Sequence, residues 1–183
     1  YDLNKAKQLL AQAGYPNGGF KLLLTYLTGD TREEGTVELI KSSLKNLNIE
    51  LDIRAMTWIE QWSLAQGAPL KAQDIFVMYW WPTLLSPYDF LMNLFHSESS
   101  PVFNLGYYYN SDFDSLIDQA YALEGSDKAR AFSMYHQAEK MVIDDAANIF
   151  FWDLQDIHIV RSNISGFSYN PASTTVVIFY SLH

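Results

Sequence analysis

Residues 20–56 have the sequence FKLLLTYLTGDTREEGTVELIKSSLKNLNIELDIRAM. Residues 20–27 are mostly apolar, as in a strand, and residues 31–46 place apolar side chains on one face at helical spacing. Residues 49–56 alternate apolar with charged side chains, which is typical of a half-buried strand. A strand, a helix and a second strand in this order form a βαβ unit with parallel strands. The stretch therefore predicts an α/β fold with a mostly parallel sheet flanked by helices.

The segments on either side of this stretch extend the pattern. Residues 2–14 predict a helix that Asp2 caps and that Gly14 ends in a left-handed turn. Residues 57–66 predict a short helix, and the apolar residues 74–81 predict a buried strand. Strands and helices that alternate in this way indicate further βαβ units in a largely parallel sheet.

The rest of the chain has longer loops between its predicted elements. Residues 89–95 predict a short helix, and residues 96–109 form a long loop of aromatic and polar residues, a kind of loop that is often functional. Two longer helices follow, with Ser111 and Asp127 as their expected caps. The side chains expected to point inward from the second of these helices are Phe132, Tyr135, Ala138, Met141 and Val142. Three more strands are predicted, at residues 149–154, 157–161 and 175–182.

The composition excludes several classes of protein. The 183 residues include 12 Lys and Arg against 21 Asp and Glu, which gives a net charge of −9. An acidic surface repels phosphate backbones, so we expect no nucleic-acid partner. The absence of cysteine rules out disulfides and thiolate chemistry. No apolar run approaches the ~18 residues of a membrane span. The chain begins at Tyr1 inside a helical pattern, so we expect it to be a piece of a longer protein.

Motifs for catalysis and for metal or cofactor binding are missing. The four histidines show no metal-ligand spacing, and the chain has no Walker loop, no G-x-S-x-G and no G-x-G-x-x-G. Asp112, Asp114 and Asp118 cluster at a predicted helix start, where acids are favoured for structural reasons. Paired acids could also serve glycoside hydrolysis or a Ca²⁺ site, which leaves a hydrolase as an alternative. We expect no enzyme, no cofactor and no metal site.

Aromatic side chains in the middle loops are the best candidates for a binding site. Trp80 and Trp81 end a predicted parallel strand, and ligands of α/β sheets bind beyond the carboxyl ends of strands. Tyr107 lies in the long loop that follows, together with Asn104. Such side chains offer apolar contact area and hydrogen-bonding groups. Packing in the core is the alternative role for each ring.

Several segments carry a resemblance to a known family. Residues 1–16, YDLNKAKQLLAQAGYP, closely resemble the D-x-x-K-A-K-x-L-L-x-x-A-G-Y segment of dipeptide- and oligopeptide-binding proteins of ABC importers, the bacterial extracellular solute-binding family 5. Leu47-Asn48-Ile49 resembles the family's L-G-I step, with Asn48 in place of glycine. Residues 80–91, WWPTLLSPYDFL, resemble W-x-x-D-x-x-D-P-x-x-F-L, and residues 109–114, YNSDFD, resemble Y-x-N-x-x-F-D.

The resemblance implies one lobe, the carboxy-terminal one, of a two-lobed periplasmic-binding-protein-like fold. Residues 1–150 would form the ligand-binding lobe, and residues 151–183 would return toward a first lobe that this chain lacks. The family captures a peptide-like or oligosaccharide ligand in a cleft between the lobes and delivers it to the permease of an ABC importer. It is periplasmic or extracellular, and lipid-anchored in organisms with a single membrane.

One position departs from the family pattern. Peptide binders of this family pair an aspartate after the tryptophan with the amino terminus of the ligand, and Thr83 occupies that position here, while Ser86 replaces a second aspartate. A threonine offers no charge, which favours a blocked peptide, an oligosaccharide or another neutral oligomer. The expected ligand-binding residues are Trp80, Trp81, Thr83, Tyr107 and Asn104. An oligosaccharide-binding member, a sugar-binding module and a receptor that feeds a sensor remain alternatives.

Overall fold

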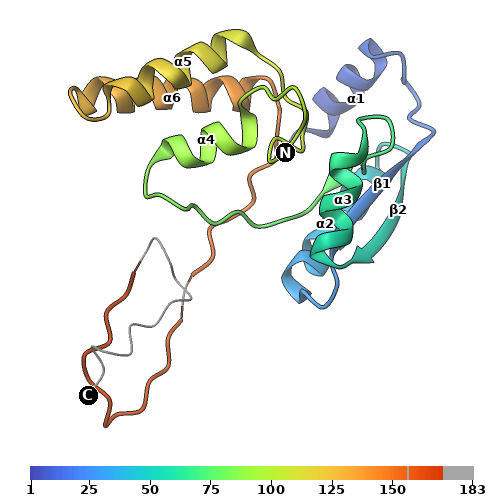
Figure 1. Cartoon of the computed structure of the whole chain (residues 1–183). Helices are drawn as coiled ribbons and strands as arrows, with labels where there is room; N and C mark the ends of the chain where they lie inside the picture. The colour runs from blue at the N-terminus through green and yellow to red at the C-terminus, as the bar shows by residue number, and fades with distance from the viewer. Residues whose placement is uncertain (156, 171–183) are drawn as a thin grey trace. The chain divides into compact units, whose positions relative to one another are not determined.

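The computed structural model describes residues 1–155 and 157–170 (Figure 1). The chain divides into two compact units, residues 1–79 and residues 80–183, and each is described by itself. Within the described residues, no helix combines the length and the apolar character that crossing a bilayer requires.

The first unit is a parallel sheet with three helices. Its elements are α1 (Leu3–Gln12), β1 (Phe20–Leu27), α2 (Thr31–Lys45), β2 (Ile49–Met56), α3 (Trp58–Gly67) and β3 (Ile75–Phe76). The strands lie in the order β2-β1-β3, with β1 parallel to both neighbours. Leu24 on β1 and Val37 on α2 are buried together with Val77, and they form the core on the α2 side of the sheet. The predicted α/β fold with a parallel sheet is confirmed.

Local capping contacts set the ends of the helices in the first unit, including both ends predicted for α1. The Asp2 carboxylate accepts the N–H of Lys5 at 2.9 Å and starts α1. Gly14 has φ of 89°, and the N–H of Tyr15 donates to the carbonyl of Leu10, which closes α1 in a Schellman turn. Thr57 caps α3 in a capping box with Glu60. These groups satisfy N–H and C=O groups that every helix end leaves without an intrahelical partner.

The strand predicted at residues 74–81 is wrong in its length, because β3 covers only Ile75–Phe76. The N–H of Asp74 donates to the carbonyl of Leu23, and the N–H of Val77 donates to the carbonyl of Thr25. The backbone groups of the odd-numbered residues of β1 therefore face β3. The next donor on that edge, the N–H of Leu27, is taken at 2.6 Å by the carboxylate of Glu33. The sequence shows the apolar run of residues 74–81, but it does not show that Glu33 takes the backbone N–H with which a longer β3 would pair.

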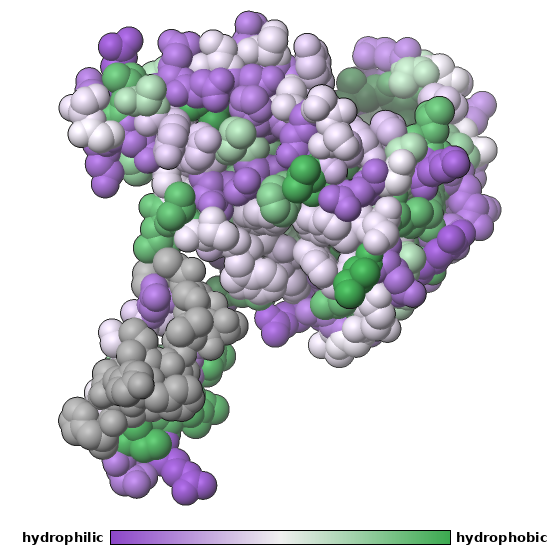
Figure 2. Space-filling view, viewed as in Figure 1, coloured by the Kyte–Doolittle hydropathy of each residue, from purple (hydrophilic) through white to green (hydrophobic). Residues whose placement is uncertain are grey.

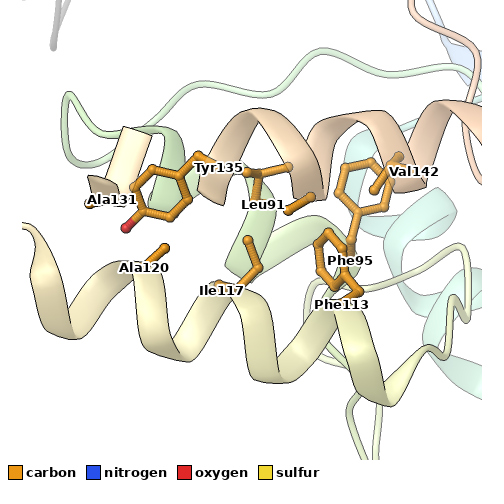
Figure 3. Packing of buried hydrophobic residues seen from close by; sticks show 9 residues of the cluster. Leu91, Phe95, Phe113, Ile117, Ala120, Ala131, Tyr135 and Val142 are labelled. Atoms are coloured by element: carbon orange, nitrogen blue, oxygen red, sulfur yellow. The ribbon is translucent and has the colours of Figure 1, made fainter. Parts of the chain in front are cut away.

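The second unit is built on α4 (Pro87–Phe95), α5 (Ser111–Leu123) and α6 (Lys128–Asp144). Helices α5 and α6 lie side by side, and α4 packs against both (Figure 1). Figure 3 shows the apolar side chains that these three helices direct toward one another. The buried cluster consists of Leu91, Phe95, Phe113, Ile117, Ala120, Ala131, Tyr135, Ala138 and Val142.

Three details of these helices differ from the prediction. Helix α4 begins at Pro87 and is capped by Ser86, two residues earlier than expected. Asn110, not Ser111, caps α5, because its side-chain oxygen accepts the N–H groups of Asp112 and Phe113. Phe132 was expected in the core but is 36% exposed. The buried stripe of α6 instead begins one residue earlier, at Ala131.

The strands predicted at residues 149–154 and 157–161 are also wrong, since no strand is assigned in the described part of residues 145–170. A strand needs a neighbouring strand to take up its backbone groups, and none pairs with this segment among the described residues. Apolar side chains including Ile149, Ile157 and Ile159 are exposed here, and Figure 2 shows hydrophobic atoms on the surface of this segment. The strand predicted at residues 175–182 lies outside the described residues. The division into a lobe of residues 1–150 and a returning segment of residues 151–183 stays a prediction.

Candidate ligand-binding site

Two loops of the second unit carry all five predicted site residues. The tryptophan loop, residues 80–86, leads into α4, and the tyrosine loop, residues 96–109, connects α4 to α5. The rings of Trp80 and Phe103 meet edge to face, with their centroids 5.4 Å apart. This contact joins the two loops, so residues that are 20 to 30 positions apart in the sequence belong to one surface region.

A buried carboxylate holds Thr83. The hydroxyl of Thr83 donates to Asp89 Oδ1 at 2.6 Å, and its backbone N–H donates to Asp89 Oδ2 at 3.1 Å. Asp89 lies in the first turn of α4 and is 4% exposed. The hydroxyl proton of Thr83 is therefore engaged within the loop, and the hydroxyl can offer a ligand only its oxygen lone pairs as acceptors. The Thr83 position carries no charge of its own toward a ligand.

A second carboxylate holds the other end of the tryptophan loop. Ser86 caps α4 by accepting the N–H of Tyr88, and its hydroxyl donates to Glu124 Oε1. The phenol of Tyr135 donates to the same oxygen at 2.7 Å. Burial, together with the carboxylate of Glu124, raises the pKa of Tyr135 far above its usual value. Glu124 thus ties together the start of α4, the end of α5 and the middle of α6.

The loop that these two carboxylates fix presents apolar side chains outward. Trp81 is 56% exposed, and Leu84 and Leu85 are exposed as well. Residues 80–86 contain no charged side chain. An ordered, uncharged loop with an exposed indole suits contact with apolar or aromatic groups, because burying its surface strands no charge.

The tyrosine loop is organised by Glu98 and Asn104. One oxygen of Glu98 accepts the N–H groups of Val102, Phe103 and Asn104, at 2.6, 3.2 and 3.2 Å. Asn104 is 3% exposed, and its side-chain amide donates to the carbonyls of His96 and Tyr108 and accepts the N–H of Tyr108. In this conformation Asn104 positions the loop, and its hydrogen-bonding groups are used inside it.

Tyr107 is held in a backbone conformation that is uncommon for a residue with a side chain. Its φ is 54°, and its N–H donates to the carbonyl of Asn104 at 3.2 Å. Burial of the ring raises the pKa of Tyr107. The left-handed conformation costs roughly 1–2 kcal/mol for such a residue, so the surrounding loop contacts must hold it in place.

Asp145 completes the attachment of the tyrosine loop. The phenol of Tyr108 donates to Asp145 at 2.6 Å, and the amide of Asn110 donates to the same oxygen at 3.2 Å. Burial and this bond raise the pKa of Tyr108 to about 12. A carboxylate at the end of α6 opposes the helix dipole, and these two bonds offset that cost. The tyrosine loop is therefore tied to the ends of both α5 and α6.

The aspartate cluster at the start of α5 has a structural role. Asp114 accepts the N–H of Ser97 at 3.0 Å and lies 3.9 Å from His96 Nδ1, while Asp118 lies 3.6 Å from His96 Nε2. These contacts fix the start of the tyrosine loop against α5. Over residues 1–155 and 157–170, no group of three or more His, Asp or Glu side chains could hold a metal ion.

Sequence patterns alone missed the residues that organise both loops: Asp89, Glu98 and Glu124. Each is an acid whose partners lie four or more residues away in the sequence. Asp89 also lies in a first helical turn, where acids are common because of the helix dipole, so its presence there does not point to a partner. The one available signal was an acid inside an otherwise apolar helix, in PYDFLMNLF at residues 87–95. An acid at such a position is exposed unless it has partners, and Asp89 has them in Thr83.

Comparison with known proteins gives the family. Residues 1–101 match the family described as bacterial extracellular solute-binding proteins, family 5 middle. A probable D,D-dipeptide-binding periplasmic protein of Escherichia coli is 32% identical over 151 residues, which are 82% of this chain and 28% of that protein. The oligopeptide-binding protein AppA of Bacillus subtilis is 27% identical over 93% of this chain and 33% of its own length. The chain spans about a third, or less, of these relatives.

Solved structures share the fold of this chain. The oligopeptide-binding protein AppA of Bacillus subtilis, in complex with a nonapeptide, superposes with a TM-score of 0.76 at 20% identity, covering 100% of this chain and 37% of that one. The periplasmic binding protein DppA of Helicobacter pylori, in complex with the peptide STSA, gives 0.75 at 24% identity and covers 100% and 34%. The predicted periplasmic-binding-protein-like fold is confirmed. The chain belongs to family 5 of the bacterial extracellular solute-binding proteins.

Proposed function

We propose that this chain supplies one lobe of a solute-binding protein that captures a peptide or a similar oligomeric ligand for an ABC importer. The observation that carries the proposal is the tryptophan loop, which is uncharged, exposes Trp81, and is held at Thr83 and Ser86 by two carboxylates. A preformed apolar contact surface lowers the cost of ordering that binding would otherwise incur. Relatives named for binding dipeptides, oligopeptides and glutathione support a peptide-like ligand.

The remaining parts of the site would come from the rest of a longer protein. The chain spans about a third of its relatives, and the exposed apolar side chains of residues 149–170 are of the kind that a further lobe would cover. In this proposal the ligand lies in a cleft between the two lobes. The closed form then docks on the permease of the importer, in the periplasm or outside the cell, with a lipid anchor where there is a single membrane.

The proposed activity is binding without chemical change. Thr83 and Asn104 use their polar groups within the loops, on Asp89 and Tyr108, and Asp114 of α5 accepts the N–H of Ser97. Ligand would stabilise the closed arrangement of lobes because it contacts more surface there than in the open one. Backbone groups and bridging water can accept many ligand sequences in such a site.

An oligosaccharide is the second candidate ligand. The exposed Trp81 ring and the uncharged Thr83 position would suit the apolar face of a sugar as well as a capped peptide. Members of this fold bind other solutes too, since a structural neighbour is titled as the complex of AgaA with agropinic acid, at 20% identity and a TM-score of 0.71.

Native mass spectrometry of the full-length protein, purified without refolding, tests the proposal because it measures the masses of the complex and of any copurified ligand. We expect an intact oligomeric ligand and a one-to-one complex. Calorimetry with that ligand should show at least about tenfold weaker binding for Trp81→Ala, since buried aromatic anchors dominate binding energy. Leu39→Ala, at an exposed position on α2, is the control and should bind like the wild type. Ligand recovered as cleaved product would contradict the proposal, as would a protein that binds no oligomer.

A further inference from the structure

A hollow of about 330 Å³ lies between α1, the turn before β1 and the turn that joins α2 to β2, within the first unit. Its lining includes Leu10, Pro16, Leu47 and two lysines, Lys7 and Lys45. The first three supply apolar surface, and the lysines supply positive charge. Among the described residues no acidic side chain lines it. This hollow, the lysine pocket, is therefore cationic on a chain whose net charge is −9.

The two lysines of this pocket are not neutralised within the described part of the chain. The ion pairs found there use other lysines, such as Lys41 with Glu38, and neither Lys7 nor Lys45 has one. No acid stands three or four positions from either residue, the spacing at which side chains of a helix meet. Lys45 complements the dipole at the end of α2, but Lys7, in the middle of α1, has no such role.

Backbone oxygens do not make the pocket a site for cations. Helices α1 and α2 both end beside it, and the last carbonyls of a helix have no intrahelical partner. Here the carbonyls of Lys45 and Asn48 accept the N–H groups of Asn48 and Gly19, and the carbonyl of Asn17 accepts the side-chain amide of Asn48 at 2.8 Å. The two ammonium groups can only donate. A carboxylate therefore suits the pocket better than a cation does.

The lysine pocket lies at the opposite end of the sheet from the usual ligand position. It adjoins the starts of β1 and β2, whose eight residues each run to Leu27 and Met56. At the rise of a β-strand, those carboxyl ends lie roughly 23 Å away. Ligands of α/β sheets bind beyond the carboxyl ends. The pocket is thus a separate surface, and what it binds goes beyond the proposed function.

We propose that the lysine pocket docks a segment of a partner protein in which an apolar side chain precedes acidic ones. The apolar side chain covers Leu10, Pro16 and Leu47, and the carboxylates reach Lys7 and Lys45. Opposite charges at such a contact favour the right partner and its orientation. The volume is about twice the roughly 150 Å³ that holds benzene, so it takes a protruding segment of about two side chains.

The shape and charge of the molecule favour a protein over a membrane as the occupant. A bilayer presents a broad surface that cannot enter a hollow, whereas a protein segment can protrude into it. The net charge of −9 also opposes approach to anionic lipid, since like charges repel over a Debye length.

Fluorescence polarisation with short peptides tests the lysine pocket on the full-length protein, which is first saturated with its copurified ligand so that its ligand site is occupied. The probe is a labelled, amide-capped peptide of sequence Ser-Gly-Leu-Glu-Glu-Gly-Ser. Two reference peptides replace both glutamates by glutamine or by lysine, and a third replaces the leucine by glycine. We expect the probe to bind at least about fivefold more tightly than the glutamine and lysine peptides and at least about threefold more tightly than the glycine peptide.

Charge reversals locate the binding. Lys7→Glu and Lys45→Glu should each weaken the probe at least about threefold, and the double variant at least about tenfold. Lys41→Glu is the control, because it makes the same change of charge one turn earlier on α2, and it should leave the affinity for the probe within about twofold of wild type. Calorimetry with the copurified ligand should give the wild-type affinity for all of these variants.

The results that would overturn this inference differ from those that would overturn the proposed function. A probe that does not bind, that binds no better than the reference peptides, or that binds the Lys7→Glu and Lys45→Glu variants as tightly as wild type refutes the docking surface and leaves the proposed function standing. Lysine-dependent sedimentation with phosphatidylglycerol vesicles, without binding of the probe, also refutes it and assigns a membrane instead. A protein that copurifies with no ligand refutes the proposed function, and the same peptides on that protein still decide whether the lysine pocket docks them.

Discussion

Acids that accept backbone N–H or hydroxyl groups recur at the residue scale. Glu33 takes the N–H of Leu27, Asp89 takes both donors of Thr83, and Glu98 takes three consecutive N–H groups. Bonds to a charged acceptor contribute roughly 1.5–3 kcal/mol, and a buried donor left without an acceptor costs a similar amount. These acids therefore fix the ends of strands and loops that hydrophobic packing alone leaves undetermined.

Glu33 offers a test of this role. It is 2% exposed, and burial raises its pKa, with the Leu27 N–H opposing the shift and Asp30 adding to it. A raised folded pKa means that the contribution of Glu33 to stability is fully present below its unfolded pKa, about 4.3, and is lost as the pH rises through the folded value. Glu33→Gln, which keeps an acceptor but no charge, should therefore be more stable than wild type at pH 7 and equal to it near pH 4.

Glu33→Ala is the matched comparison, because it also removes the acceptor of the Leu27 N–H. We expect it to lose about 1–3 kcal/mol at both pH values, measured by urea unfolding. A Glu33→Gln protein that is as destabilised as Glu33→Ala would show that the charge itself is required.

Tyr108 predicts an alkaline transition. Its folded pKa is about 12, while an unfolded tyrosine titrates near 10. Its contribution to stability is thus complete below about pH 10 and is lost as the pH rises toward 12. Melting temperatures measured from pH 8 to pH 12 should fall less steeply for Tyr108→Phe than for wild type. Tyr109→Phe, at an exposed ring, is the control, and equal slopes for all three proteins would refute the assignment.

The sequence predicts the exposed residues of the candidate site but not the contacts that hold them in place. Trp81 could be found because an aromatic pair after an apolar run is visible in the sequence. Thr83 was correctly seen as an uncharged position, but its bond to Asp89 depends on a turn between them that no local pattern specifies. Asn104 was expected to face a ligand, and instead its amide is enclosed by the loop, because three carbonyl and N–H groups converge on it.

At the scale of elements, two turns lock the first βαβ unit together. The turn before β1 packs on the turn before β2, where the Gly19 N–H donates to the Asn48 carbonyl at 2.7 Å. Gly18 has φ of 60°, and a Cβ there would lie 2.1 Å from the carbonyl oxygen of Leu47. Asn48, with φ of 55°, stands where the family pattern has glycine, and asparagine is among the few residues that tolerate this conformation.

Gly18→Ala should therefore destabilise the protein by roughly 2–3 kcal/mol, through backbone strain and the clash with Leu47. Gly35→Ala is the control, because Gly35 lies within α2 with no atom near its added Cβ. That change should stabilise by about 0.5–1 kcal/mol, as alanine is the better helix former. Chemical denaturation measures both, and equal stabilities of the two variants would contradict the packing of these turns.

The accuracy of the predicted elements follows from how local their causes are. Strands β1 and β2, Asp2 as the cap of α1 and Asp127 as the cap of α6 were predicted correctly, since alternation and capping residues lie within a few positions of each other. The length of β3 and the conformation of residues 149–161 were predicted wrongly, because a strand forms only where a partner strand offers free backbone groups. Glu33 removes such a group at β3, and that competition is not visible in the sequence of β3 itself.

At the scale of the whole molecule, we propose that this chain provides one part of the binding surface. The family, the fold and the share of its relatives that this chain spans all fit one lobe of a longer binding protein. Within the proposal, most of the binding free energy arises when the second lobe covers the ligand.

The isolated 183-residue chain should therefore bind the copurified ligand at least about a hundredfold more weakly than the full-length protein, the equivalent of roughly 2.7 kcal/mol. Calorimetry on both forms measures the difference, with circular dichroism to verify that the isolated chain is folded. Sub-micromolar binding by the isolated chain would show that the proposed second lobe is not needed.

We propose that the ligand contacts the tryptophan and tyrosine loops of the second unit. Hydrogen–deuterium exchange of the full-length protein, with and without its copurified ligand, measures this directly, because bound backbone segments exchange more slowly. We expect slower exchange in residues 80–86 and 101–109 on binding, with little change in α2. Protection confined to other segments, with these two loops exchanging as in the ligand-free protein, would contradict it.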